Sequence, residues 1–432
     1  MPRNLSRDPH LSLSQFEDRR EVGFLNFYSW VATATLFVQI PTITRVTIGT
    51  VLFLPLIPKI WPLLRSRPWL KSLNRWAIAA VIVTFALPIA TLALDSGRNF
   101  DWGLYWTTGL AVLQFYLILI STFFSIEFFG LGTSLLLLSI GAAINFFQIT
   151  EGDPTLNPWK YYLVWPVSLL TALIASKLKY PLALLPISAL IAISAATGSR
   201  NAFLVLCLVV FCSILLGVDR VRQAITLQLL RRFFVFALTS LLFVVPFFLN
   251  WVGQGGLGQD LQSRQLEQLQ VGFLGSRVEP TVGIGLVLSS PVGIGAGVEP
   301  SPSDTKSGLS SFSTFLNPDA LSTAYVQSRV LGSTVELHSV ALDFWVVASF
   351  VGIYFALKCL KLLFMGLASV SKTKHFYACL FLFFQAFWDM LFSPLVVNAK
   401  YCAVAIAVAI YFERKNLKVG EIDEVANTQF AV

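Results

Sequence analysis

Two ionisable residues stand out because each lies directly beside a long apolar run. Arg200 sits in the segment ATGSRNAF, between the apolar stretches 182–195 and 204–216. His338 opens a second apolar run, in the segment ELHSVALDFWVVASF. Ionisable side chains near membrane depth are costly and tend to be functional. The alternative is that each residue only marks a helix end, with the arginine reaching toward the membrane surface.

Arginine and histidine together suit a phosphate-bearing substrate. The guanidinium fork of arginine binds phosphate through two parallel hydrogen bonds and keeps its charge in a partly dry site. A histidine beside it acts as a general base near neutral pH. Arg264, Arg277 and Arg329 fall in the polar stretch between these two residues. We therefore expect a phosphate-bearing lipid substrate, with these arginines in its binding site or on the solvated loop surface.

The composition indicates what must position these residues. The chain has 432 residues, of which 56% are hydrophobic and 12% are charged, whereas a soluble domain carries roughly 25% charged residues. The apolar residues form blocks of about 17–25 residues, the length that crosses a bilayer as a helix. The net charge of +8 comes from basic residues scattered between these blocks. The pattern predicts an all-α polytopic membrane protein that contacts lipids and does not bind nucleic acid.

The apolar blocks predict about twelve transmembrane helices. Prolines such as Pro55, Pro88 and Pro166 interrupt or end some of them, which a helix bundle tolerates because neighbouring groups satisfy the freed carbonyls. The predicted ranges are 24–40, 46–60, 76–94, 103–125, 128–149, 161–176, 180–197, 201–217, 233–249, 339–364, 376–394 and 399–412.

The basic residues predict the orientation, because cytoplasmic loops are enriched in Lys and Arg. With the N-terminus in the cytoplasm, 22 of the 31 basic residues fall on the cytoplasmic side. The nine on the other side are Arg45, Arg98, Lys160, Arg200, Arg264, Arg277, Lys306, Arg329 and Lys400. We therefore place both termini in the cytoplasm, with the first apolar block as an uncleaved signal anchor.

This topology divides the chain into five parts around one long extracytoplasmic loop. The loop contains a helical pattern, GQDLQSRQLEQLQ, and then an apolar, glycine-rich stretch at 277–297. We expect that stretch to be re-entrant or to lie on the surface, with an additional crossing as the alternative. The parts are a cytoplasmic tail 1–23, helices in 24–249, the loop 250–337, helices in 338–412 and a cytoplasmic tail 413–432.

Three ordered motifs resemble the O-antigen ligase and polymerase superfamily. The first is TGSRNAFLVL, a Ser-Arg turn followed by an apolar helix. The second is SRVEPTVGIGLVLSSPVGIGAG, an arginine, a helix and then Pro291, Gly293, Gly295 and Gly297. The third is His338 with Gly352 fourteen residues later. Their order and spacing match the family over about residues 196–355.

The resemblance implies a GT-C-like membrane glycosyltransferase of polysaccharide and cell-envelope biosynthesis. Such proteins move a glycan from a polyprenyl diphosphate carrier, such as undecaprenyl diphosphate, to a glycan or lipid acceptor on the outer membrane face. They use no metal, cofactor or nucleotide sugar, and they work beside flippase and chain-length proteins. By resemblance, Arg200 and His338 are catalytic, and Arg200 binds the diphosphate with Arg277, Arg264 and Arg329.

The sequence also departs from the family pattern. Ser339 replaces the usual Asn, Val347 and Ser349 stand where Glu and Gly are common, and no Trp follows Arg277. These differences bear on the particular reaction, ligation or polymerisation, more than on the fold.

Two other function classes remain open from the sequence. An anion transporter, such as a bicarbonate carrier, would use intramembrane carboxylates, and Asp343 and Asp389 are candidates, although polar contacts within the bundle also explain them. The chain also lacks the internal repeat expected of many transporters. The other class is a non-catalytic partner in polysaccharide export, for which the long loop would dock another protein.

Overall fold

The computed structural model describes residues 19–40, 43–149, 159–216, 279–315, 326–332, 335 and 337–429. In this part of the chain, five helices are long and apolar enough to cross a membrane, and several shorter apolar helices lie beside them. The five are Ile48–Arg65, which comprises three helical pieces, Pro68–Leu94, Trp102–Phe129, Val340–Ser369 and Leu395–Lys415. The protein is therefore a helical membrane protein, as predicted.

The predicted apolar ranges coincide with helices wherever the structure describes them, apart from the first two ranges. The range 233–249 lies outside the described residues. The elements are α1 (Arg19–Ala34), β1 (Gln39–Ile40), β2 (Ile43–Thr47), α2 (Ile48–Phe53), η2 (Leu54–Leu56), α3 (Ile57–Arg65), α4 (Pro68–Leu94), α5 (Trp102–Phe129), α6 (Leu131–Ile149), η3 (Trp159–Leu163), α7 (Val164–Ala175), α8 (Leu184–Ala196), α9 (Arg200–Leu216), α14 (Glu279–Ser289), α15 (Pro302–Phe315), η4 (Val326–Val330), α17 (Val340–Ser369), η5 (Val370–Lys372), α18 (Phe376–Phe392) and α19 (Leu395–Gln429).

The first two predicted ranges need correction. The helix predicted at 24–40 ends at Ala34, and the following residues form a short antiparallel hairpin of β1 and β2. Residues 38–47 are rich in β-branched side chains, which favour a pleated strand over a helix. The helix predicted at 46–60 is divided into α2, η2 and α3, and prolines occupy the first turns of the latter two, where the fixed φ of proline is tolerated.

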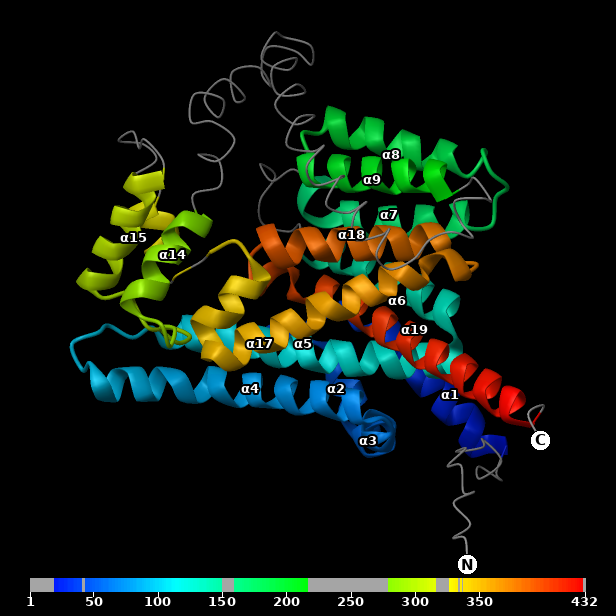
Figure 1. Cartoon of the computed structure of the whole chain (residues 1–432), viewed down its shortest axis with the longest axis horizontal. Helices are drawn as coiled ribbons and strands as arrows, with labels where there is room; N and C mark the ends of the chain where they lie inside the picture. The colour runs from blue at the N-terminus through cyan, green and yellow to red at the C-terminus, as the bar shows by residue number, and fades with distance from the viewer. Residues whose placement is uncertain are drawn as a thin grey trace, which may run out of the picture.

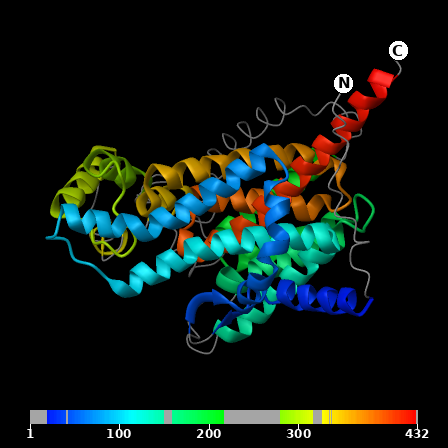
Figure 2. The ribbon, with the colours of Figure 1, turned by 90° about the horizontal axis from the view of Figure 1, so that it is seen from below.

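The helices form a bundle with two distinct ends (Figures 1 and 2). The start of α1 and the end of α19 lie at one end of the long axis, and α14 and α15 lie at the other. The α8–α9 turn faces the same end as α14 and α15 (Figure 1). The 176–183 and 370–375 connections face the end with the start of α1 and the end of α19 (Figure 1). The number of membrane crossings and the side that faces the cytoplasm stay predictions.

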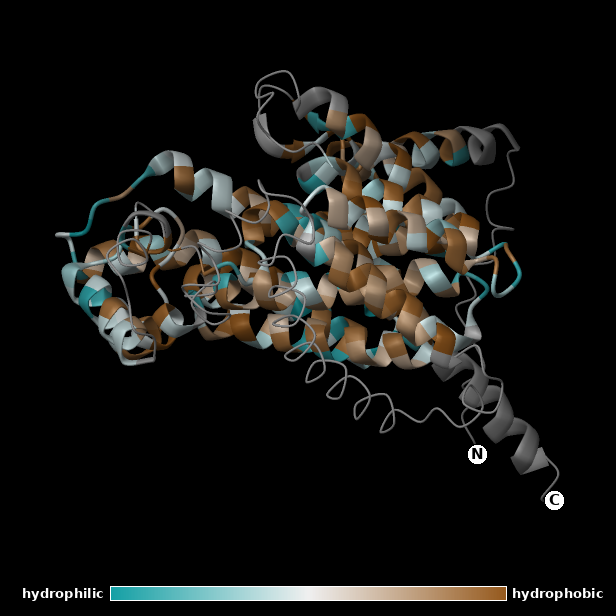
Figure 3. Ribbon diagram, turned by 90° about the horizontal axis from the view of Figure 1, so that it is seen from above, coloured by the Kyte–Doolittle hydropathy of each residue, from teal (hydrophilic) through white to brown (hydrophobic). Residues whose placement is uncertain are grey.

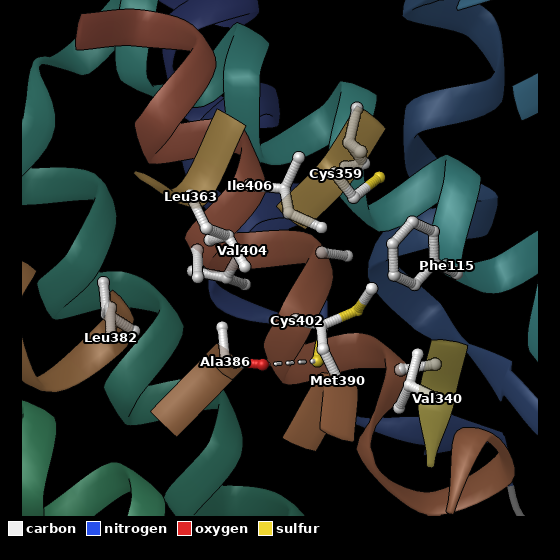
Figure 4. Close-up of a cluster of buried hydrophobic side chains, with 14 of the residues drawn as sticks. Phe115, Val340, Cys359, Leu363, Leu382, Ala386, Met390, Cys402, Val404 and Ile406 are labelled. Carbon is white, nitrogen blue, oxygen red and sulfur yellow. Dashed lines mark hydrogen bonds between the residues drawn. The ribbon is translucent and has the colours of Figure 1, made fainter. Parts of the chain in front are cut away.

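The core lies where α5, α17, α18 and α19 pack together. Phe115 of α5 makes edge contacts with Phe344 and Phe355 of α17, at 5.4 and 5.7 Å between ring centroids. Figure 4 shows this region, with Cys359 and Cys402 among apolar side chains. Most of the bundle is apolar, whereas α15 carries more polar residues (Figure 3). The apolar helix α14 and the more polar helix α15 therefore lie together at one end of the bundle.

The two ends of the bundle give a direct test of orientation. We expect Ser303→Cys, exposed on α15, to react with a membrane-impermeant thiol reagent in spheroplasts. We expect Lys374→Cys, exposed at the opposite end, to react only after the membrane is opened. Both variants are made after replacing the five native cysteines, and labelling is measured by mass shift. The reversed pattern would contradict the predicted orientation.

Candidate functional site

His338 occupies an unusual backbone conformation at the start of α17. Its φ is 45°, in the left-handed region that non-glycine residues rarely adopt. The side chain is partly buried, with 28% of its surface exposed, and its Nδ1 lies 3.5 Å from Oε1 of Glu279. The next residue, Ser339, caps α17: its hydroxyl accepts the Leu342 N–H and donates to the Met390 carbonyl.

Asp343 fixes the chain on both sides of this site. Its Oδ1 accepts the N–H of Leu337, the residue before His338, at 2.9 Å. Its Oδ2 accepts the N–H of Leu395, the first residue of α19, also at 2.9 Å. Asp343 is only 5% exposed, and a buried carboxylate needs such donors. One side chain therefore ties the approach to His338, the first turn of α17 and the start of α19 together.

A kink interrupts α17 eleven residues after His338. Ala348 has φ −131° and ψ 18°, and Ser349 has φ 58° and ψ −153°. The second pair of angles belongs to a region that essentially only glycine occupies. The backbone here therefore has a conformation that glycine would favour, although this chain carries serine.

The glycine-rich motif packs against this kink. The Val346 carbonyl accepts the N–H groups of Ile294 and Gly295, at 3.0 and 2.9 Å. These donors lie where the kink interrupts the helical hydrogen-bond ladder. The Trp345 indole N–H donates to the Pro291 carbonyl at 3.0 Å. The second and third sequence motifs thus meet through backbone hydrogen bonds.

Close packing explains the glycines of this motif. Gly293, Gly295 and Gly297 all have positive φ. A Cβ at Gly293 would lie 2.6 Å from the Trp345 carbonyl oxygen, and one at Gly297 would lie 2.5 Å from the Asp101 carbonyl oxygen. Both distances are too short for carbon and oxygen, so a side chain cannot fit without backbone movement. The motif works here as a strap that joins α17 to the α4–α5 connection.

A salt bridge and several hydrogen bonds hold the α14–α15 hairpin on the same connection. Arg98 Nη1 lies 2.8 Å from Asp304 Oδ2. Asp304 also accepts hydrogen bonds from Ser289, Ser290 and Ser301. Burial raises the pKa of Asp304, but these hydrogen bonds outweigh burial and leave the pKa below its ordinary value. A depressed carboxyl pKa contributes stability above the unfolded-state pKa, which is lost as the pH falls through the folded pKa.

Glu279 begins α14 and lies against His338. Its side chain is 4% exposed, and α14 has 11 residues, too few to cross the hydrocarbon core at 1.5 Å per residue. This agrees with the expectation that the segment does not cross the membrane. Glu279 was not among the predicted site residues. The available signal was an acidic residue two positions after Arg277, directly before an apolar helix.

The Arg200 motif forms the turn between α8 and α9. Gly198 has φ 68°, and the Ser199 N–H donates to the Ser194 carbonyl at 2.8 Å, a common way for glycine to end a helix. Arg200 is the first residue of α9, close to the predicted start at 201. Its backbone therefore lies at a helix N-terminus, where positive dipole and free N–H groups favour anions.

The structure describes the five predicted site residues to different extents. It describes His338 fully. For Arg200 and Arg329 it describes the backbone, and their side chains lie outside the description. Arg264 and Arg277 lie outside the described residues. Their convergence on one substrate therefore stays a prediction.

The two intramembrane aspartates have partners within the bundle. Asp343 accepts two backbone N–H groups, as above. Asp389 Oδ1 accepts hydrogen bonds from Gln385 at 3.0 Å and Ser393 at 2.7 Å. These contacts match the interpretation of both residues as polar contacts between and within helices.

Ser349→Gly tests the strained kink. We expect this variant to stabilise the protein by about 1 kcal/mol, because glycine removes a strain of order 1–3 kcal/mol and loses part of that gain to its greater freedom when unfolded. The measurement is the thermal unfolding of the purified protein in detergent. The matched control is Ser121→Gly in the regular helix α5, which should destabilise by roughly 0.5 kcal/mol. If Ser349→Gly and Ser121→Gly both destabilise the protein, the backbone at Ser349 is not strained.

No protein-family model matches this chain, and neither a curated protein nor a solved structure does. The resemblance to the O-antigen ligase and polymerase superfamily therefore rests on the three sequence motifs.

Proposed function

We propose that the protein is a membrane glycosyltransferase related to O-antigen ligases and polymerases. It takes a glycan from a polyprenyl diphosphate carrier and joins it to a glycan or lipid acceptor on the outer face of the bacterial cytoplasmic membrane. The contact that carries this proposal is the one between His338 Nδ1 and the buried carboxylate of Glu279, at 3.5 Å.

At 3.5 Å the two groups face each other without a hydrogen bond, and catalytic contacts of this kind often tighten only when substrate binds. A carboxylate in this position orients the imidazole once that hydrogen bond forms, and it leaves the other nitrogen for the substrate. Glu279 comes from α14 and His338 from the start of α17, so the pair joins the loop to the membrane helices. Asp343 and Ser339 hold the backbone around His338 from both sides. Such supporting contacts are what a positioned general base requires.

In the proposed reaction, the acceptor hydroxyl oxygen attacks the anomeric carbon of the carrier-linked sugar. His338 Nε2 takes the hydroxyl proton as the new glycosidic bond forms. The bond between the anomeric carbon and the diphosphate oxygen breaks, and polyprenyl diphosphate leaves with the bonding electrons. Arg200, with Arg277 and the weaker candidates Arg264 and Arg329, stabilises the charge that develops on the diphosphate.

Reconstituted protein provides the test. Proteoliposomes that contain the protein and a polyprenyl diphosphate-linked oligosaccharide should yield free polyprenyl diphosphate together with an extended or acceptor-linked glycan. Products are separated by chromatography and identified by mass. Uptake of labelled bicarbonate without glycan transfer would support the transporter, and neither activity with a complete set of donors and acceptors would support the export partner.

Glu279→Gln tests the carrying contact within that assay. Because the amide cannot stabilise the imidazolium that forms in the reaction, we expect transfer to fall by at least about tenfold. The matched control is Glu299→Gln, two residues after the strap, whose carboxylate accepts a hydrogen bond from Asn99 instead. If Glu279→Gln and Glu299→Gln transfer glycan at the same rate, Glu279 does not take part in the reaction.

A further inference from the structure

A buried polar cluster around Asp389 takes no part in the proposed reaction. The Asp389 side chain is fully buried, and Gln385 and Ser393 are each only 6% exposed. Gln385 lies one turn before Asp389 on α18, and Ser393 follows the last residue of that helix. Both neighbours donate to the same carboxyl oxygen, Oδ1, through the Gln385 amide and the Ser393 hydroxyl. The other carboxyl oxygen receives neither of these donors.

Two oxygens of this cluster have no hydrogen-bond partner among the described residues. They are Oδ2 of Asp389 and Oε1 of Gln385, and both are buried. Unpaired buried polar atoms are costly and rare in folded proteins. An amide oxygen and an ionised carboxylate oxygen can only accept hydrogen bonds. The cluster therefore lacks a donor.

The surroundings of Asp389 offer no cation to offset a negative charge. The helices that pack on α18 are α7, α9, α17 and α19, and no salt bridge links a described residue of these helices to Asp389. The titratable groups that interact with it are the Tyr401 hydroxyl and the Cys402 thiol of α19. Figure 4 shows Ala386 and Met390, on either side of Asp389 in α18, among apolar side chains. An ionised carboxylate is costly in such an environment.

The number of unpaired oxygens indicates which group is missing. A metal ion that binds through oxygen takes about six ligands, whereas this cluster offers two unpaired oxygens. A proton needs only these two, because a protonated Oδ2 becomes a donor that the amide oxygen can accept. The proton also removes the negative charge. One proton therefore supplies both the missing donor and the missing positive charge.

Asp343 on α17 provides a contrast, because its two oxygens accept the backbone N–H groups of Leu337 and Leu395. Hydrogen bonds of this kind stabilise the ionised form of a carboxyl group. The two aspartates lie in neighbouring turns of the bundle, since Ser339 at the start of α17 donates to the Met390 carbonyl, next to Asp389. Only Asp389 has a carboxyl oxygen without a donor.

We propose that Asp389 is a proton-binding site within the bundle, in which the proton lies on Oδ2 and is donated to Oε1 of Gln385. The acid O–H and the amide N–H then form two hydrogen bonds between the same pair of side chains, while Ser393 also donates to Oδ1. The proton comes from water, and Asp389 is neutral at pH 7. This inference concerns proton binding alone and does not depend on the proposed glycan transfer.

Infrared spectroscopy of the purified full-length protein in detergent tests the site at pH 7. A protonated carboxyl group has a C=O band separate from those of ionised carboxylates, and deuterium exchange shifts it. We expect Asp389→Asn to remove such a band from the wild-type spectrum. The control is Glu299→Gln, at a carboxylate that accepts a hydrogen bond from Asn99, and it should leave the band unchanged. A wild-type spectrum without this band would indicate an ionised Asp389 and overturn the proposal.

Two further measurements test the pairing with Gln385. Asparagine at position 389 offers an amide N–H where the acid has its O–H, so Asp389→Asn should unfold at the wild-type temperature. A clearly lower unfolding temperature would show that the protein needs the charged carboxylate. Gln385→Leu removes the N–H donor from the carboxyl C=O, so the band should move to higher frequency. An unmoved band in this variant would contradict the acid–amide pair, including when Asp389→Asn does not accumulate.

Discussion

His338→Ala should reduce glycan transfer by about 10²–10⁴-fold, the usual contribution of a general base. The imidazole is the group proposed to take the acceptor proton, and alanine leaves no replacement. The side chain is 28% exposed and contacts Glu279 at 3.5 Å, so its removal does not open a large apolar cavity. We expect the variant to accumulate in the membrane at the wild-type level, and the rate is measured in the reconstituted assay.

The backbone at His338 complicates this variant, because alanine is also strained at φ 45°. His338→Asn provides the control, since asparagine adopts left-handed angles more readily but has no basic nitrogen. Its folded stability should match the wild type while its transfer remains as low as that of the alanine variant. Normal transfer by either variant would show that His338 is not the base.

Arg200→Ala should reduce transfer by about 10²–10³-fold, comparable to the loss of one group that stabilises an oxyanion. Arg200→Lys keeps the charge but loses the planar fork, so it should recover only part of the activity. Both are assayed with donor concentration varied, which separates donor binding from the chemical step. The control is Lys374→Gln at the opposite end of the bundle, which should transfer normally. Full activity of Arg200→Ala would reduce Arg200 to a helix-end residue.

The sequence predicted the helices well because apolar pattern and block length are properties of the local sequence and do not depend on tertiary contacts. Ser339 at the start of α17 and Asp101 before α5 are ordinary N-cap residues, and both boundaries fell within one residue of the prediction. The hairpin at 39–47 was missed because a short apolar β-branched run looks alike as strand or helix. The glycines that follow the helix of the second motif were noted in the sequence, and their positive φ angles are ones that glycine adopts readily.

The partners of the candidate site could not be read from the sequence. In the sequence, Asp343 is a carboxylate within an apolar run and has no visible partner. In the structure it accepts the N–H groups of Leu337 and Leu395, and so joins the approach to His338, the start of α17 and the start of α19. The contact of Glu279 with His338 joins residues 59 positions apart. The left-handed conformation of His338 and the kink at Ser349 depend on such tertiary contacts. Residue type and spacing indicate where chemistry is feasible, but the supporting contacts require the folded chain.

Cross-linking tests most directly whether Arg200 and His338 belong to one site. In a cysteine-free background, Arg200→Cys and His338→Cys are combined and treated with a bifunctional thiol reagent that spans about 10 Å, the size expected for a diphosphate with one sugar. The positive control combines Glu279→Cys with His338→Cys, whose native side chains are in contact. The proposed site predicts an efficient cross-link in both pairs. A cross-link in the control alone would contradict the shared site.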